Sequence, residues 1–411
     1  MAFEMTPEVH ARMDEFFDKR IGRHLSRKQR ESFAIYAHGL IGDGERKSVE
    51  PIAARATGDG RECKHMHDRL LYFVGRSGWS DRLVRREAAW YAIRCLQACE
   101  PVTTWILDDT GFLKQGVHSV GVHRQYTGTA GKITNCQIAV SLSVATRTEH
   151  VPIDFELYLP KCWTEDPVRR VEARIPEDVV FKTKTELAIE LIARAVEDKL
   201  PGEIVLVDAA YGSSSDLRNV IRMYGLDIGV AIGATTKVWL LDTAERRRGE
   251  PVAVQQLGIE LGPAAFRRIT WREGTRKGSR GKLHSRFCFR RVKVAHDDGT
   301  EAKDREPLWL MIEWPDGEAK PTKFALTSLP RRMSKKAIVR HVKERWRTER
   351  AYEDLKGELG LDHFEGRSFP GWHHHVSVAL CCSAFIISER VRHFPPSQGR
   401  TGPSRTNLRA A

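Results

Sequence analysis

The sequence of 411 residues lacks the features that mark membrane and secreted proteins. No apolar run approaches the roughly 20 residues that a membrane-spanning helix needs. The first residues, MAFEMTPEVHARMDEFF, have neither the basic start nor the apolar core of a signal peptide. The 8 cysteines include no CxxC pair, so we interpret them as reduced thiols and expect no zinc site. These absences predict a cytoplasmic protein without a membrane partner.

Positive charge, by contrast, is in excess and is concentrated in one segment. The 67 Lys and Arg residues exceed the 54 Asp and Glu residues, which gives a net charge of +13. Between Arg267 and Lys293 there are 11 Lys or Arg residues and one acid, Glu273. A basic surface of this size favours a polyanion, and nucleic acid is the better interpretation in the absence of a membrane signal. The candidate DNA contacts in this segment are Arg276, Lys277, Arg280 and Lys282.

Two further patterns give no support for a cofactor. The segments GDGER and GTAGK contain glycine turns without the pattern of a phosphate-binding loop, so no nucleotide cofactor is predicted. His373, His374 and His375 are consecutive, and neighbouring residues on a helix point about 100° apart, so they are poorly placed to share one metal ion. We interpret this histidine run as structural or as a contact to a DNA backbone.

Changes in hydrophobic period divide the chain into five parts. The first has helical spacing, with Thr6 as a cap and Pro7 at the first helical position, and such a bundle either packs on the core or binds DNA. Alternating, β-branched runs follow, and then alternating helices and strands, which together predict an α/β sheet with helices packed on it. The predicted parts are a helical DNA-binding domain (1–100), the first part of the core (101–234), a β-rich basic insertion (235–326), the C-terminal helices of the core (327–393) and a disordered tail (394–411).

Three acids stand at the ends of predicted strands. Asp108 and Asp109 end the strand TTWILDD, and Asp208 ends the strand EIVLVD. Ligands of α/β sheets gather at the carboxyl ends of strands, although a single Asp at such a position most often only starts a turn. Clustered carboxylates bind hard cations, and two magnesium ions held in this way support phosphodiester chemistry. That chemistry needs a third acid from elsewhere in the chain.

The helix KERWRTERAYEDLK, residues 343–356, offers the third acid. At about 100° per residue, Arg345, Glu349, Tyr352 and Lys356 fall on one face, beside an apolar face that is suited to packing on a sheet. Glu349 is thus an acid flanked by cations at the edge of a buried stripe. Ordinary ion pairs along a helix remain the alternative interpretation of the same spacing.

This helix resembles the signature of a known family. The chain resembles the DDE transposases of bacterial insertion sequences, in the branch marked by a Tyr-x2-Arg-x3-Glu-x6-Lys signature. Arg345, Glu349 and Lys356 match the Arg, Glu and Lys with the correct gaps. Val342 stands at the position where the family has Tyr.

The strand-end acids are also similar to the family pattern. DDTGF is similar to the family's first Asp followed by Thr, which selects Asp109 over Asp108. VLVDAAYG is similar to the segment of the second Asp, which is Asp208. The likeness extends from KSVEPIAAR near the start to ELGLDHFEGRSFPGWHHH near the end, so it covers nearly the whole chain.

The resemblance implies a fold and a reaction. It implies a ribonuclease-H-like core, a mixed sheet flanked by helices, that holds Asp109, Asp208 and Glu349 around two Mg²⁺ ions, which Mn²⁺ can replace. The β-rich segment 235–326 would then be the insertion domain of this branch. The implied reaction is cleavage of double-stranded DNA at transposon ends and joining of the 3′-hydroxyl to target DNA, by a homodimer located at the bacterial nucleoid.

The resemblance also implies contacts to DNA. Arg345 and Lys356 would hold phosphates near the break. Tyr352 shares the face of Glu349 and is the candidate to replace the missing Tyr. Trp239 is the candidate in the insertion to hold a flipped base, and a place in the core is its other interpretation. Two alternative functions remain open: a catalytically inactive DNA-binding relative, against which the three acids argue, and a structure-selective nuclease without strand transfer.

Overall fold

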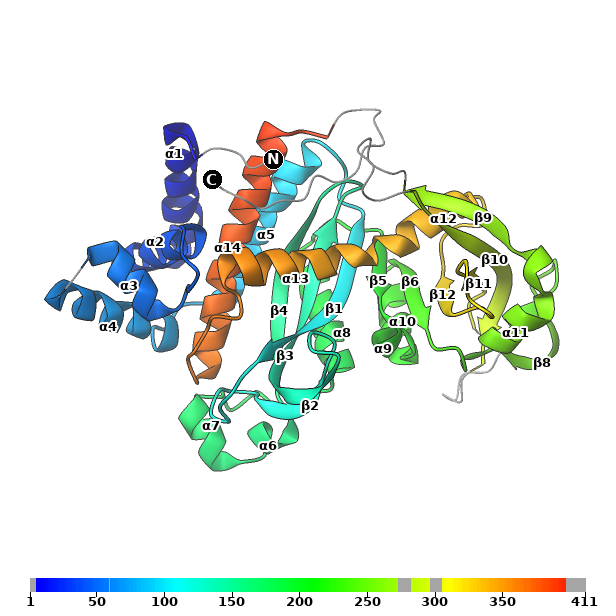
Figure 1. Ribbon diagram of the computed structural model, residues 1–411, viewed down its shortest axis with the longest axis horizontal. Helices are drawn as coiled ribbons and strands as arrows, with labels where there is room; N and C mark the ends of the chain where they lie inside the picture. Colours follow the sequence, from blue (N-terminus) through cyan, green and yellow to red (C-terminus); the bar gives the residue numbers. More distant parts are fainter. Residues whose placement is uncertain (1–4, 59, 273–281, 296–304, 397–411) are drawn as a thin grey trace.

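The structure is a computed structural model and describes residues 5–58, 60–272, 282–295 and 305–396. Figure 1 shows N-terminal helices at one end, a central sheet with its helices, and further strands at the other end. Within these ranges, no helix is both long and apolar enough to cross a membrane.

The N-terminal part is helical, as its spacing predicts. Its elements are α1 (Pro7–Glu15), a π-helical turn (Phe16–Ile21), a 3-10 turn (Gly22–His24), α2 (Arg27–Ile41), α3 (Val49–Thr57), α4 (Arg61–Gly75) and α5 (Asp81–Gln97). The side chain of Thr6 accepts a hydrogen bond from the backbone N–H of Val9, and Ser26 forms a capping box with Gln29 at the start of α2. Helices α2, α4 and α5 pack against α14 (Phe369–His393), which is buried on all sides along most of its length.

The central sheet has the strand order β4–β3–β1–β5–β6. Its strands are β1 (Thr104–Leu113), β3 (Lys132–Ala145), β4 (His150–Tyr158), β5 (Ile204–Val207) and β6 (Asp227–Ile232), and β2 (His123–Thr127) pairs with the start of β3. β3 is antiparallel to β1 and β4, whereas β5 is parallel to β1 and β6. This mixed sheet, flanked by helices, confirms the ribonuclease-H-like fold class that the sequence predicts.

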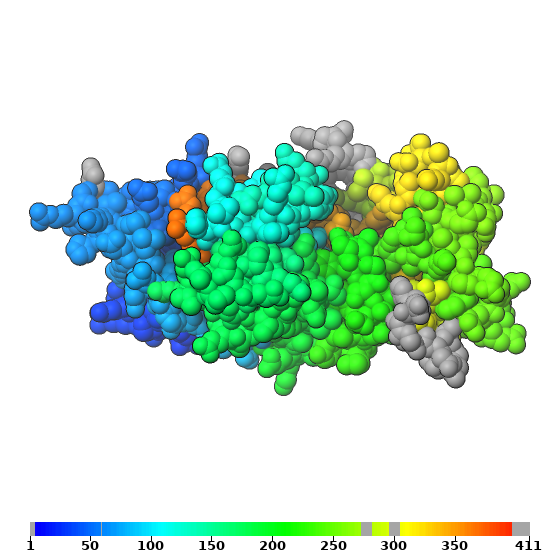
Figure 2. Space-filling model, turned by 90° about the horizontal axis from the view of Figure 1, so that it is seen from below, coloured from blue at the N-terminus to red at the C-terminus, as the bar shows by residue number. Residues whose placement is uncertain are grey.

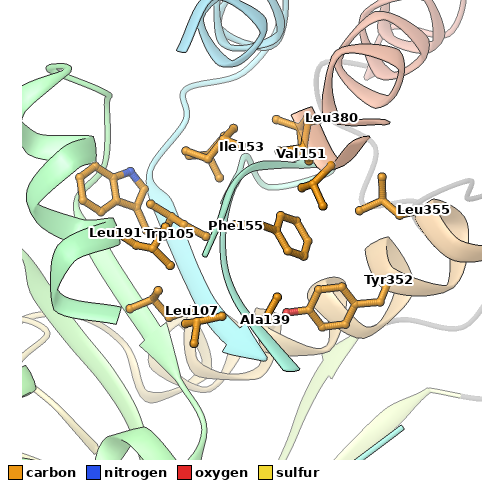
Figure 3. Close-up of a cluster of buried hydrophobic side chains, with 14 of the residues drawn as sticks. Trp105, Leu107, Ala139, Val151, Ile153, Phe155, Leu191, Tyr352, Leu355 and Leu380 are labelled. Carbon is orange, nitrogen blue, oxygen red and sulfur yellow. The ribbon is translucent and has the colours of Figure 1, made fainter. Parts of the chain in front are cut away.

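Helices cover both faces of this sheet. One face carries α8 (Lys184–Glu197) and α10 (Ser215–Met223), and the other carries α12 (Lys335–Val342) and α13 (Trp346–Leu359). Strand alternation sorts the side chains: Trp105 and Leu107 of β1 pack toward Leu191 of α8, while Phe155 of β4 faces Tyr352 of α13 (Figure 3). Shorter helices are α6 (Lys161–Thr164), α7 (Pro167–Ala173) and α9 (Ala209–Gly212).

The predicted β-rich insertion continues the central sheet. Its elements are β7 (Lys237–Leu241), β8 (Arg247–Ala253), α11 (Val254–Leu261), a 3-10 turn (Pro263–Ala265), β9 (Arg267–Arg272), β10 (Leu283–Val294), β11 (Leu308–Trp314) and β12 (Lys323–Thr327). β12 returns to pair antiparallel with β6, with Phe324 opposite Ile232. In the described residues the core and the insertion therefore share one sheet of 12 strands.

The C-terminal helices bring the segment 343–356 back to the core. A 3-10 turn (Lys343–Arg345) joins α12 to α13, and Gly360 ends α13 with a φ of 61°, a left-handed conformation that suits glycine. α14 ends at His393, and most of the predicted disordered tail, residues 397–411, lies outside the described residues.

Candidate active site

The two adjacent aspartates of β1 point to opposite faces of the sheet. The carboxylate of Asp108 accepts a hydrogen bond from Nη1 of Arg345 at 2.7 Å, so it lies on the α13 face. The carboxylate of Asp109 accepts from Nζ of Lys184 at 2.8 Å and from the hydroxyl of Tyr211 at 3.1 Å, so it lies on the α8 face. The period of 2 along a strand makes this separation unavoidable.

Asp208 follows β5 and lies on the same face as Asp108. β5 is parallel to β1 with Ile106 opposite Leu206, so the residues two positions further along, Asp108 and Asp208, have the same phase in the pleat. Oδ1 of Asp208 accepts the backbone N–H groups of Ala210 and Tyr211 at 3.0 and 3.2 Å and thereby caps the short helix α9.

The first turn of α13 delivers Glu349 to this face. Arg345 donates to Asp108 through Nη1 and to Oε1 of Glu349 through Nη2, the latter at 2.9 Å, so one guanidinium links the strand to the helix. About two turns further on, Nζ of Lys356 donates to Oγ1 of Thr110 at 2.8 Å and to the carbonyl of Gly111 at 2.6 Å. Asp108, Glu349 and Lys356 are therefore held together by contacts between β1 and α13.

The electrostatics of this cluster are unbalanced toward negative charge. The pKa of Asp108 is raised to about 7, chiefly by burial; Arg345 acts in the opposite direction, and the nearby carboxylate of Asp208 adds to the rise. Burial also lowers the pKa of Lys356. A carboxyl group with such a raised pKa would be stabilised in its ionised form by an additional cation.

The structure thus separates Asp109, the carboxylate expected from the family pattern, from the contacts that join Asp108 to Arg345, and the assignment of Asp109 stays a prediction. Asp109 lies on the opposite face and is engaged by Lys184 and Tyr211, away from Arg345 and Glu349. The choice of Asp109 came from the Thr that follows it. The alternation of side chains along β1 separates the two aspartates. Thr110, which Lys356 of α13 contacts, lies on the same face of β1 as Asp108, two residues earlier.

Tyr352 is buried between α13 and the sheet, although helical spacing alone places it on the face of Glu349. Its side chain is 8% exposed, packs against Phe155 and bonds through its hydroxyl to Oγ of Ser141 at 2.6 Å (Figure 3). Burial raises the pKa of this hydroxyl well above its ordinary value. In this structure the side chain is held in the core by these contacts, and a DNA contact by Tyr352 stays a prediction.

Val342, at the family's Tyr position, also faces the core. It ends α12 and packs against a cluster that includes Ile106, Leu206 and Ile338. A Cβ added at Gly229 of β6 would lie 3.5 Å from Val342, so the helix approaches the sheet closely at this point. The Val is thus a packing residue beneath the turn that carries Arg345.

The remaining predicted DNA contacts lie in the insertion. Trp239 on β7 is partly buried, and the guanidinium of Arg247 lies 5.1 Å from the centre of its ring. Lys282 is exposed directly before β10. Arg276, Lys277 and Arg280 lie outside the described residues. The proposed contacts of this basic segment therefore stay predictions.

The three consecutive histidines are structural in this fold. His373, His374 and His375 are all buried in α14. Nδ1 of His375 lies 2.8 Å from the hydroxyl of Tyr36, and Nε2 of His373 lies 3.0 Å from Oε1 of Glu156. The described part of the chain contains no group of three or more His, Cys, Asp and Glu side chains placed to hold a metal ion.

Comparisons with known proteins find the DDE transposase family that the sequence resembles. Residues 20–278 match the family described as DDE superfamily endonuclease, and residues 176–385 match the family described as Transposase DDE domain. The probable transposase for insertion sequence element IS701 of Microchaete diplosiphon is 27% identical over 212 residues, 51% of each chain, so this chain spans about half the length of that relative. The cryo-EM structure of a piggyBac transposase synaptic complex with hairpin DNA aligns with a TM-score of 0.45 and 11% identity, over 96% of this chain and 75% of that one.

Proposed function

The chain belongs to the DDE superfamily of endonucleases and carries a transposase DDE domain, and on this premise we propose that it is the transposase of an insertion sequence. It would cleave DNA at the transposon ends and join the freed 3′-hydroxyl to target DNA. The observation that carries this proposal is the shared face of Asp108, Asp208 and Glu349, because carboxylates gathered at strand ends suit phosphodiester chemistry.

We further propose that Asp108, Asp208 and Glu349 would hold two Mg²⁺ ions, for which Mn²⁺ can substitute; in the described structure the three carboxylates are not yet gathered into a metal-binding group, so binding would have to draw them together. Oxygen donors of this kind fit Mg²⁺, and the raised pKa of the buried Asp108 supports a site that requires more positive charge than Arg345 supplies. When bound, such ions activate a nucleophilic water or hydroxyl and stabilise the leaving oxygen.

The chain's own cations would position the DNA and the third acid. The guanidinium of Arg345 is a planar fork and suits a phosphate oxygen pair, whereas the ammonium of Lys356 is a point charge. Through its bonds to Thr110 and Gly111, Lys356 also fixes α13 against β1, and this keeps Glu349 beside the strand-end carboxylates. The proposed roles of Arg345 and Lys356 are thus to contact DNA phosphates and to keep Glu349 in place.

The partner that we propose is double-stranded DNA, at both the transposon ends and the target. The active form would be a homodimer, because joining two ends to one target requires two active sites. Contacts by Trp239, Lys282 and the basic segment of the insertion belong to this proposal, and so does a place at the bacterial nucleoid.

Incubation with its own transposon ends tests the proposed function. The inverted repeats that flank the gene supply the end sequences, and the reaction contains Mg²⁺ and supercoiled target DNA. We expect the wild-type protein to nick the ends and join them, and Glu349→Gln and Asp208→Asn to abolish both steps while retaining DNA binding. Cleavage without joining would indicate a nuclease, and binding without cleavage an inactive relative; either result overturns the proposal.

A further inference from the structure

A hairpin at the edge of the central sheet leaves an apolar and basic face uncovered. β2 and the first residues of β3 pair antiparallel, with Tyr126 directly opposite Ile133. Tyr126 is 62% exposed and Ile133 is 59% exposed, although both are large apolar side chains. Arg124 is also exposed and shares their side of the hairpin, because it lies two residues before Tyr126. We refer to Arg124, Tyr126 and Ile133 as the hairpin face.

The hairpin face points to the same side of the sheet as Asp108. β3 pairs in continuous register with both β1 and β2, so its alternation runs unbroken from Ile133 to Ser141. Ser141 lies opposite Asp108 and contacts Tyr352 of α13. The eight residue steps from Ile133 to Ser141 span roughly 26 Å at about 3.3 Å per residue. The hairpin therefore extends the active-site face outward, and Figure 2 shows its segment at the molecular surface.

Hydrogen bonds connect the base of the hairpin to the segment that follows α13. Nδ2 of Asn135 donates to the carbonyl oxygens of Lys114 and Gly116, both at 2.8 Å. Nζ of Lys114 in turn donates to the carbonyl of Phe364 at 2.7 Å. The hairpin face thus has a fixed position relative to α13, and a ligand that it binds meets a preorganised surface.

The charge of this region selects the partner. From Thr110 to Thr148 the sequence contains no Asp and no Glu, although the chain has 54 acids in total. A second copy of the chain would place two identical cationic faces together without an acid to pair them, which is unfavourable. A polyanion with grooves fits better, since the major groove of B-DNA admits a two-stranded β-ribbon.

We propose that the hairpin face binds duplex DNA beside the cleavage site. Arg124 would contact a phosphate, and Tyr126 and Ile133 would contact sugars or base edges. At 3.4 Å per base pair, roughly 26 Å places this contact about 7–8 base pairs from the scissile phosphate. The inference rests on the proposed function, because it assumes that cleavage takes place at Asp108.

Binding titrations of the full chain test the proposal, with controls on the opposite face of the same sheet. The variants are Arg124→Gln and the double variant Tyr126→Ser/Ile133→Ser, measured by fluorescence anisotropy on an end duplex over a range of salt. Arg124→Gln should reduce the slope of log Kd against log salt by about 1, as one lost phosphate contact does. The double variant should weaken binding about tenfold with the slope unchanged. Lys132→Gln and Leu113→Ser, which alternation places on the other side, should match the wild type.

A second test uses duplexes that are shortened, on one side at a time, to about 5 base pairs from the scissile phosphate. On the duplex that lacks the side contacted by the hairpin, wild type and hairpin variants should bind with the same affinity. Thermal melts confirm that each variant is folded. Wild type that neither binds nor cleaves end DNA contradicts the proposed function itself. Wild type that binds and cleaves, with hairpin variants equal to it, overturns this inference alone. If the hairpin variants lose self-association in sedimentation while their DNA affinity is unchanged, the hairpin face binds a second copy of the chain, and the inference is also overturned.

Discussion

Replacing Asp108 by Asn should make the metal-free protein harder to unfold at alkaline pH. The pKa of Asp108 rises from 3.8 to about 7 in the fold, so the native state binds a proton more tightly than the unfolded state does. This stabilising contribution is complete below pH 3.8 and is lost as pH rises through about 7. At 1.36 kcal/mol per pKa unit, the ionised carboxyl costs on the order of 2–4 kcal/mol at pH 8. The isosteric Asn carries no charge and avoids this cost.

Urea unfolding of wild type and Asp108→Asn in EDTA, followed by circular dichroism from pH 5 to pH 8, measures the effect. We expect the variant's advantage in free energy of unfolding to grow with pH across this range. The matched control is Asp109→Asn, whose loss of the ion pair with Lys184 should lower stability by up to about 1 kcal/mol. An Asp108→Asn variant that is no more stable than wild type at pH 8 would refute the reasoning, because the carboxyl would then be as well compensated in the fold as in water.

Three further substitutions test the interpretation of buried groups. Tyr352→Phe removes the bond to Ser141 and should cost about 1 kcal/mol in urea unfolding while leaving the rate of end cleavage unchanged. Val342→Tyr restores the family signature but overfills the space beside Gly229, so it should cost about 1–3 kcal/mol without raising cleavage. Lys47→Met should cost about 1–3 kcal/mol, since the buried Nζ of Lys47 donates to carbonyls at the ends of α2 and α13, which would be left unpaired.

Local patterns predicted the elements of the fold well, because they depend on neighbouring residues. The cap at Thr6 begins the helix that it predicts, and helical, β-rich and again helical segments follow one another along the chain. The continuity of the sheet through β6 and β12 was not predictable in this way. It depends on pairing between residues about 100 positions apart, such as Ile232 and Phe324, which leave no local pattern.

The residues of the candidate site were predictable from the sequence, but the face of β1 on which they meet was not. The spacing of Arg345 and Glu349 correctly predicts that they meet on one face of α13. The choice between Asp108 and Asp109 depends on which side of β1 the distant helix α13 covers, and motif spacing carries no information about that side. The burial of Tyr352 was not predictable for a related reason, because a helical wheel gives an angle and does not give the depth at which the helix packs on the sheet.

The central proposal is that Asp108, rather than Asp109, is the first carboxylate of the active site. Cleavage of a labelled transposon end in Mg²⁺ by Asp108→Asn and Asp109→Asn, on the same substrate and with DNA binding verified for both, tests it most directly. The structure predicts a loss of more than roughly 100-fold for Asp108→Asn, which exceeds the usual effect of removing a group that only supports a metal ligand, and at most about a tenfold loss for Asp109→Asn. Full activity of Asp108→Asn together with an inactive Asp109→Asn would contradict the account.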